Sequence, residues 1–168
     1  MATCGNISGE PVITDNRDAT QRLNSIADAF LHHNRPILRP ADDSLYRIIC
    51  NQPRPLRLGR GVAPLEMTLS QPLSKTILAV GGQMKNSVAI AWNNRVVISP
   101  HIGDLQSLRS QQIFSQIIDD LQQLYQIKIE AIACDAHPGY DSHRIAYSIA
   151  HSLNLPVTEV LHHHAHAS

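Results

Sequence analysis

Cysteine, net charge and long apolar runs are all scarce in this sequence, and each absence excludes a class of protein. The three cysteines, Cys4, Cys50 and Cys134, are odd in number and form no C-x-x-C pair, which argues against a disulfide framework and a self-contained zinc ribbon. The formal net charge is zero, without a long basic run, so the electrostatic footprint of nucleic-acid binding is missing. No apolar run approaches the roughly 18 residues that span a bilayer, and no signal peptide is recognisable. We therefore expect a cytoplasmic protein without a membrane or nucleic-acid partner.

Apolar residues and histidine are what the sequence has instead. Its 168 residues are 43% hydrophobic, which is enough for one domain, or parts of two, with a buried core. Ten histidines are an unusual number, and seven of them lie from His137 onward. This asymmetry points to the C-terminal part of the chain as the place to look for function.

The first 70 residues combine one helical pattern with a stretch interrupted by prolines. Apolar residues recur at helical spacing over residues 15–33, and Asp15, Asn16 or Asp18 is available as an N-cap. Residues 36–64 contain five prolines and short apolar pieces, which predict edge strands, turns and a linker. We place a domain boundary at about residue 70.

From Thr76 onward the pattern changes to alternating strands and helices. The order is β-β-β-α-β-α-β, and Asn93-Asn94 between the second and third strands suits a hairpin turn with positive φ. The chain is thus an α/β protein, an α+β piece followed by a ribonuclease-H-like half-domain, whose ligands should gather beyond the carboxyl ends of the strands. The predicted strands are residues 77–80, 87–92, 95–99, 129–134 and 156–161, and the predicted helices are 107–126, with Ile113, Ile117, Leu121 and Leu124 on one face, and 141–153.

A histidine cluster occupies residues 162–166. His162 and His166 are four residues apart, so on a helical turn both imidazoles face the same side and could hold one cation. Neutral imidazole suits Zn, Fe or Ni. An expression tag is disfavoured because Ala165 interrupts the run and a predicted buried strand precedes it, whereas a solvated polar tail stays open. A third ligand would have to come from elsewhere.

A glycine turn lies between the first two predicted strands of this half. In Gly81-Gly82-Gln83-Met84-Lys85-Asn86-Ser87, exposed backbone N–H groups, a lysine and a hydroxyl could hold phosphate oxygens. The spacing is not that of the P-loop, and an ordinary glycine turn with a surface lysine explains it equally well.

Polar side chains also follow the third and fourth predicted strands. His101 and Asp104 come after the third strand, and Asp135, His137 and Tyr140 come after the fourth. An aspartate at a strand end can hold a divalent metal or position a nucleophile, although it is often only a cap or turn former. Because these loops and the glycine turn could converge on one crevice, we favour function.

In the first segment, Asn6, Ser8, Arg57 and Arg60 could contact a phosphate or carboxylate through amide, hydroxyl and guanidinium groups. A solvated loop and linker is the alternative.

Taken in order, these motifs resemble the hydrogenase maturation carbamoyltransferases of the HypF type. The resemblance runs from about residue 3 to the last residue. The segments that carry it are residues 3–11, 34–37 with 42–44, 57–64, 79–86, 99–105, 135–142 and 160–166.

The resemblance implies two domains with different tasks. Residues 1–70 would be the C-terminal part of a YrdC-like domain that forms carbamoyl adenylate, and residues 71–168 the N-terminal part of an actin-like carbamoyltransferase domain. The substrates would be carbamoyl phosphate and ATP, with Mg accompanying ATP. The acceptor would be a cysteine thiol of a partner maturation protein, and the product would later yield the cyanide ligand of nickel–iron hydrogenases.

The resemblance also assigns expected roles to residues. It implies a divalent metal of the Zn or Fe class on His162 and His166, cofactor or nucleotide contacts from Gly81, Gly82, Asn6, Ser8, Arg57 and Arg60, and a catalytic crevice lined by Lys85, Asn86, His101, Asp104, Asp135, His137 and Tyr140.

The sequence departs from the family pattern at Cys4, where the family has serine, and at Leu58-Gly59, where it has Arg-Ser. The family's other domains and the remaining half of the actin-like domain are not recognisable, so we expect a truncated copy. Two other functions stay open. One is a threonylcarbamoyl-transfer relative acting in tRNA modification, and the other is a non-catalytic remnant that binds nucleotide or metal.

Overall fold

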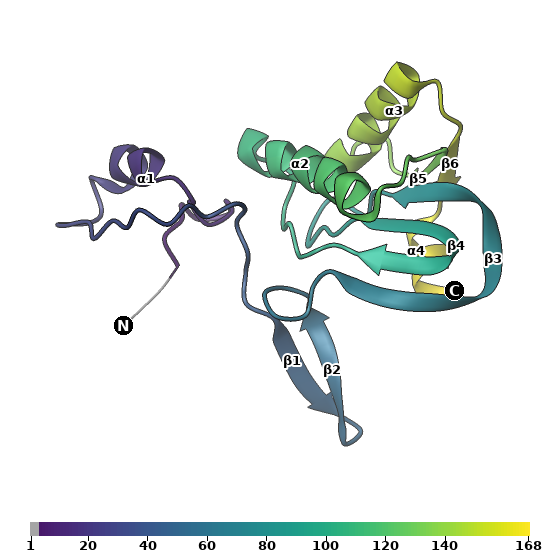
Figure 1. Cartoon of the computed structure of the whole chain (residues 1–168), viewed down its shortest axis with the longest axis horizontal. Coiled ribbons are helices and arrows are strands. Elements are labelled where there is room, and N and C mark those ends of the chain that lie inside the picture. Colours follow the sequence, from purple (N-terminus) through teal and green to yellow (C-terminus); the bar gives the residue numbers. More distant parts are fainter. Residues whose placement is uncertain (1–3) are drawn as a thin grey trace.

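The computed structural model describes residues 4–168, and its two halves differ strongly in how much they bury (Figure 1). Residues 4–64 contain one short helix and one two-stranded hairpin, both standing clear of the sheet in the figure. The second half is a four-stranded sheet with helices packed on it. Among residues 4–70, Ile13 is the one buried hydrophobic residue, so the hydrophobic core belongs to the second half.

The helix of the first half is α1, Asn16–Leu23. Of the three expected N-cap candidates, Asp15 takes the role, because its carboxylate accepts hydrogen bonds from the N–H groups of the next turn. The prediction of a helix through residue 33 was wrong. Ile26 and Leu31 are 73% and 100% exposed, so no packing surface among the described residues rewards continued helix there.

Strands β1, Leu45–Ile49, and β2, Gln52–Arg57, form an antiparallel hairpin. The residues between them, Cys50 and Asn51, both have positive φ, which suits a two-residue turn. β2 carries two prolines, which lack a backbone N–H group. Because β2 pairs only with β1 among the described strands, these prolines cost the sheet few hydrogen bonds. The expectation of edge strands is therefore confirmed, and part of the expected linker is itself a strand.

The first two strands of the sheet are long and bent. β3, Leu65–Ala79, pairs antiparallel with β4, Ala89–Ile98, and the register shifts twice along their length. β4 folds back on itself in Figure 1, and the Ser99 N–H donates to the Val88 carbonyl oxygen across 2.8 Å at its open end. Asn93 at the bend has a φ of 47°, which confirms the predicted hairpin turn.

The remaining elements follow the predicted alternation. β5, Ala131–Asp135, pairs parallel with β3, and β6, Val157–Val160, pairs parallel with β5, which gives the sheet order β4-β3-β5-β6. α2, Leu108–Tyr125, lies between β4 and β5, and α3, Asp141–Leu153, lies between β5 and β6. α4, His162–Ala167, follows β6. The predicted α/β order is confirmed. β6 is only partly buried, so the expected buried strand is instead the edge of this sheet.

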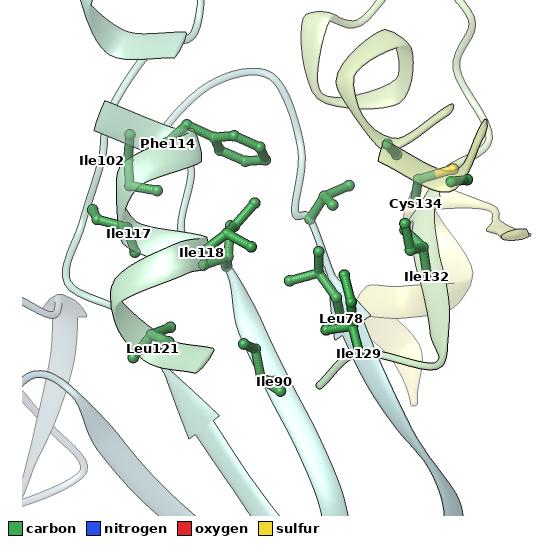
Figure 2. Packing of buried hydrophobic residues seen from close by; sticks show 14 of the residues in the cluster. Leu78, Ile90, Ile102, Phe114, Ile117, Ile118, Leu121, Ile129, Ile132 and Cys134 are labelled. Atoms are coloured by element: carbon green, nitrogen blue, oxygen red, sulfur yellow. The ribbon is translucent and has the colours of Figure 1, made fainter. Parts of the chain in front are cut away.

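The core lies between α2, α3 and one face of the sheet. Phe114, Ile117, Ile118 and Leu121 of α2 meet strand residues such as Leu78 and Ile90 (Figure 2). The predicted face of α2 is shifted, because Leu124 is 62% exposed and Phe114 is fully buried in its stead. The alternate residues of β3 and β5 point to the opposite face and leave it lined by small side chains such as Ala79 and Ala133.

Two ion pairs connect the first half to α2. Arg109 lies 2.7 Å from Asp18 of α1, and Arg39 lies 3.2 Å from Asp120. Among the helices within residues 4–168, none combines the length and apolar character that a membrane crossing needs.

Candidate functional site

A cavity of about 310 Å³ opens where β3, β5 and β6 end, beside α4. Figure 1 shows α4, in yellow, on the far side of the sheet from α2. Gly81 and Gly82 line the cavity from the loop after β3, Asp135 lines it from the end of β5, and His162 and His166 line it from α4. The remaining lining is mostly small and apolar, with Ala79, Ala133, Val160 and Ala165.

The polar centre of this cavity is a bond between Asp135 and His162. The Nδ1 atom of His162 lies 2.6 Å from Oδ2 of Asp135. The Asp135 side chain is only 8% exposed, whereas that of His162 is 49% exposed. A carboxylate that accepts from Nδ1 fixes the tautomer of the ring and leaves Nε2 with its lone pair available.

The second histidine meets the first at that free nitrogen. His166 Nε2 lies 3.2 Å from His162 Nε2, one helical turn apart on α4, as the i, i+4 spacing predicted. Two nitrogens bound to one tetrahedral zinc at about 2.0–2.1 Å are about 3.3 Å apart, so this pair has the separation of two ligands of one cation. Within residues 4–168, no group of three or more histidine, cysteine, aspartate or glutamate side chains is arranged to hold a metal. The pair therefore fits two positions of a metal site and no more.

The glycine loop lies directly against this pair. A Cβ atom placed on Gly82 would be 3.7 Å from Cε1 of His162 and 4.0 Å from Oδ2 of Asp135. Gly81 has a φ of 68°, and a Cβ there would lie 2.5 Å from the Ser87 carbonyl oxygen, so glycine is required. In the described part of the chain, the N–H groups of Gly81 and Gly82 have no protein acceptor. They are free to donate to a ligand.

Asn86 holds the loop from inside. It is 1% exposed, and its Nδ2 donates to the carbonyl oxygens of Val80 at 2.8 Å and Gly82 at 2.6 Å. Its Oδ1 is buried without a partner among the described residues. Lys85, the next residue back, is exposed and has a φ of 51°. Neither residue lines the cavity. Asn86 therefore acts on the loop through its hydrogen bonds, and a contact of Lys85 with ligand stays a prediction.

Gln83 and Asp141 form a hydrogen-bonded pair that the sequence analysis did not predict. Gln83 Nε2 donates to Asp141 Oδ2 at 2.8 Å, and the Asp141 N–H donates to Gln83 Oε1 at 2.7 Å. The bond from Gln83 is the main cause that holds the pKa of Asp141 below its ordinary value, and Arg144 adds to it. This pair joins the glycine loop to the start of α3.

His101 and Asp104 lie outside the cavity lining. The N–H of His101 donates to the Leu58 carbonyl oxygen at 2.7 Å, which ties this loop to the segment before β3. Burial is the main cause that lowers the pKa of His101. Asp104 Oδ1 accepts from the Gln106 N–H at 3.1 Å, the geometry of a turn former.

His137 and Tyr140 lie in the loop after β5, where their rings stack with centroids 4.1 Å apart. His137 is exposed, and neither residue lines the cavity. The structure thus brings together Gly81, Gly82, Asp135, His162 and His166 from the predicted set. It does not place the other residues of the predicted crevice in the same cavity.

Cys134 also lines the cavity, but its thiol belongs to the core side of β5. It is 3% exposed, and burial raises the pKa of the thiol, with Glu159 and Asp135 adding to the shift. A thiol kept protonated in this way is a poor nucleophile and a poor metal ligand at neutral pH. Its neighbour His143 lies with Nδ1 3.0 Å from the Asp135 carbonyl oxygen.

The side chains expected at the adenylate site bond mostly to atoms of their own part of the chain. Arg57 Nε donates to the Asp43 carbonyl oxygen at 2.9 Å, and Arg60 pairs with the Asp43 carboxylate at 2.6 Å. Asn6 Nδ2 donates to the carbonyl oxygens of its own loop, including that of Glu10 at 2.9 Å. Ser8 is exposed. Contacts of these four residues with a nucleotide stay a prediction.

Fold and cavity together define the class of protein. It is an α/β chain in which a ribonuclease-H-like half-domain presents a glycine loop and an aspartate-oriented histidine pair at the strand ends. Residues 72–168 match the family model HypF_C, the HypF Kae1-like domain, and residues 1–59 match the Sua5/YciO/YrdC family, described as telomere recombination. The chain belongs to the HypF carbamoyltransferase family.

Several relatives and solved structures are similar along nearly the whole chain. The carbamoyltransferase HypF of Synechocystis sp. is 48% identical over 166 residues, and HypF2 of Cupriavidus necator is 37% identical over 170. Each alignment covers 99% of this chain and 21% of the relative, so the chain spans about a fifth of the length of these proteins. A crystal structure of full-length HypF in the phosphate- and nucleotide-bound form matches with a TM-score of 0.89 and 39% identity, over 98% of this chain and 25% of that one. T. kodakarensis HypF also has a TM-score of 0.89, with 31% identity over 98% of this chain and 21% of that one.

Proposed function

We propose that this chain carries a phosphate- and cation-binding pocket that serves carbamoyl transfer in hydrogenase maturation. In this proposal the complete enzyme hydrolyses carbamoyl phosphate to carbamate and phosphate, and the carbamate oxygen attacks the α-phosphate of ATP, bound with Mg, to form carbamoyl adenylate and release pyrophosphate. A cysteine thiol of a partner maturation protein then takes the carbamoyl group and loses its proton, with AMP as the leaving group. The reaction as a whole belongs to the longer relatives, and this chain contributes the pocket at the ends of β3 and β5.

One observation carries the proposal. The Nε2 atoms of His162 and His166 lie 3.2 Å apart, and Oδ2 of Asp135 orients the His162 ring from 2.6 Å at its other nitrogen, Nδ1. Gly82, whose N–H is free among the described residues, lies against the same imidazole. A cation bound by the two histidines would thus be next to N–H groups that favour an anion, the combination that a phosphate or carbamoyl oxygen needs.

The donor set suits a divalent cation of the Zn or Fe class, held by His162 and His166. Such a cation, when bound, supplies charge that polarises a carbamoyl or phosphoryl oxygen. The chain's own residues orient and desolvate the substrate. Asp135 keeps His162 in one tautomer, Gly81 and Gly82 donate their N–H groups, and the alanine lining displaces part of the water around a labile carbamoyl compound.

The division of the chain supports the same proposal. We assign residues 1–70 to a YrdC-like unit and residues 71–168 to the actin-like unit, in keeping with the family matches over 1–59 and 72–168. β3 begins at Leu65, so the sheet of the second unit starts slightly before the proposed boundary.

Ligand titration followed by NMR tests the proposal. Freshly dissolved carbamoyl phosphate and, separately, inorganic phosphate are added to the chain while the N–H signals of Gly81 and Gly82 are recorded. We expect saturable shifts of both signals in the wild type. Gly82→Val should abolish them, because its side chain would fill the space next to His162, whose Cε1 lies 3.7 Å from the position that a Cβ of residue 82 would take.

Gly5→Val is the matched control, since a Cβ at Gly5 meets nothing within 4 Å. It should bind as the wild type does. Shifts that cluster away from the cavity, or no shifts at all, would contradict the proposal. An absence of binding would favour the alternative of a non-catalytic remnant.

A further inference from the structure

Gln83 makes two hydrogen bonds to one residue 58 positions away. Its Nε2 donates to Oδ2 of Asp141 at 2.8 Å, and its Oε1 accepts from the Asp141 N–H at 2.7 Å. The orientation of the carboxamide is fixed by chemistry, because the reversed amide would set NH₂ against N–H and oxygen against carboxylate. Both bonds are partly buried, which strengthens them relative to a surface pair.

The carboxylate of Asp141, which accepts the bond from Gln83, is ionised at neutral pH. The bond from Gln83 is the largest cause that lowers the pKa of Asp141, and the Arg144 guanidinium adds a second. The other oxygen of Asp141 pairs with Arg144. A neutral carboxamide fits between this carboxylate and the N–H, whereas a second carboxylate would be repelled.

The residue before Gln83 touches the candidate site. A Cβ on Gly82 would lie 3.7 Å from the His162 ring, and Gly82 and its neighbour have no side chains that could hold them there. Asn86 secures the loop from its inner side through the Gly82 carbonyl oxygen at 2.6 Å. On the other side, the side-chain contact that reaches α3 is that of Gln83.

We propose that Gln83 is a positioning residue that clamps the glycine loop to the start of α3 and so keeps the Gly81 and Gly82 N–H groups in place for a phosphate group beside His162. The inference rests on the proposed function, because it presumes that this loop binds phosphate. Loss of the clamp should leave the core unchanged, since Gln83 itself contributes nothing to the buried apolar cluster.

The experiment compares Gln83→Leu and Gln83→Glu with the wild-type chain. The probe is inorganic phosphate without metal, and the dissociation constant comes from the NMR shifts of the Gly81 and Gly82 N–H signals. At a pH of about 7.5, Gln83→Leu should bind about tenfold more weakly, the equivalent of one hydrogen bond to a charged group. Gln83→Glu should bind at least as weakly, because its carboxylate would face that of Asp141.

Lowering the pH distinguishes a positioning role of Gln83 from a nonspecific loss of structure in its variants. When one proton is shared between the introduced carboxyl group and Asp141, the two-bond clamp can form again. The ratio of the Gln83→Glu dissociation constant to that of the wild type should therefore fall toward one as the pH falls to about 5. The same ratio for Gln83→Leu should stay constant, because leucine cannot bind the proton.

Gln116 supplies a matched control. Its Nε2 donates to Asp120 at 2.9 Å on the exposed side of α2, so Gln116→Leu and Gln116→Glu change the same chemistry away from the loop. Both should bind phosphate as the wild type does. If Gln83→Leu stays within about twofold of the wild type, or the Gln83→Glu ratio does not change with pH, the clamp is refuted while the phosphate site stands. If the wild type itself shows no phosphate shifts, the proposed function fails and the clamp fails with it.

Discussion

Asp135 and His162 are 27 positions apart in the sequence, yet the carboxylate of the first lies 2.6 Å from Nδ1 of the second. Asp135 ends β5, and His162 starts α4 one residue after the end of β6, which pairs parallel with β5. The parallel pairing brings the carboxyl ends of both strands to one edge, where the carboxylate can orient the imidazole. The site thus follows from the topology of the sheet.

This bond predicts the effect of replacing Asp135. Asp135→Asn and Asp135→Ala should weaken binding of a divalent cation to the histidine pair by about 10- to 100-fold, because the ring loses its orienting carboxylate. Calorimetric titration with Zn²⁺ measures the affinity. Asp119→Asn, on the exposed side of α2, is the control and should leave it unchanged. Equal affinities of Asp135→Ala and wild type would show that Asp135 does not support His162.

Gly81 should tolerate no side chain. Its φ is 68°, and a Cβ would come within 2.5 Å of the Ser87 carbonyl oxygen. Gly81→Ala is therefore expected to lower the free energy of unfolding by about 1–3 kcal/mol through backbone strain and displacement of the loop. Gly61→Ala shares the positive φ but meets nothing within 4 Å, so it should cost less. Urea denaturation measures both, and equal losses would rule out the steric part of this explanation.

Asn86 should not tolerate a negative charge. Its Nδ2 donates to two carbonyl oxygens at 2.8 and 2.6 Å in a fully buried position. Asn86→Asp would set a carboxylate against both acceptors and should cost about 3 kcal/mol or more of unfolding free energy, measured by urea denaturation. The exposed Asn94 offers the same change as a control, expected to be nearly neutral. A neutral Asn86→Asp would contradict the assigned bonds.

The stability of the fold should fall in mild acid partly because of His101. Burial is the largest cause that lowers its pKa, Arg57 and Lys85 act in the same direction, and Asp42 opposes them. The folded pKa is thus below the unfolded value of about 6.5, so the unfolded chain binds the proton first. The contribution of His101 to the free energy of unfolding is fully present above about pH 6.5 and is lost as the pH falls toward the folded pKa.

His101→Gln should remove that part of the decline. Urea denaturation between about pH 7.5 and 5 should show a flatter profile for this variant than for the wild type. His151→Gln, at an exposed position of α3, should keep the wild-type profile. A His101→Gln profile parallel to that of the wild type would show that His101 titrates alike in both states.

The sequence predicted the fold best where periodicity and packing agree. The alternating strands and helices from Thr76 onward carry clear two- and 3.6-residue patterns, and their residues form the core. The helix over residues 15–33 has an equally good apolar pattern, yet it ends at Leu23, since Ile26 and Leu31 have nothing to pack against among the described residues. Periodicity shows which face would be buried, but not whether a partner surface is present.

The candidate site was likewise predictable from the sequence in one part and not in another. The i, i+4 spacing of His162 and His166 is local, so the sequence alone placed both rings on one side of a turn. The bond between Gln83 and Asp141 joins residues 58 positions apart and left no local pattern to detect. Asn86 was assigned to the crevice from its neighbours, whereas only the three-dimensional structure shows its amide turned inward.

A cobalt titration of the histidine cluster is the sharpest test of the proposed cation site. Co²⁺ replaces zinc-class cations and reports imidazole coordination through its visible absorption. We predict that His162→Ala and His166→Ala each abolish the absorption, because their Nε2 atoms lie 3.2 Å apart and act together. His163→Ala and His164→Ala, at exposed positions of the same short helix, should keep it. If all four variants bind cobalt alike, or if the loss follows His163 or His164 instead, the cluster is a solvated tail and the proposed cation site is wrong.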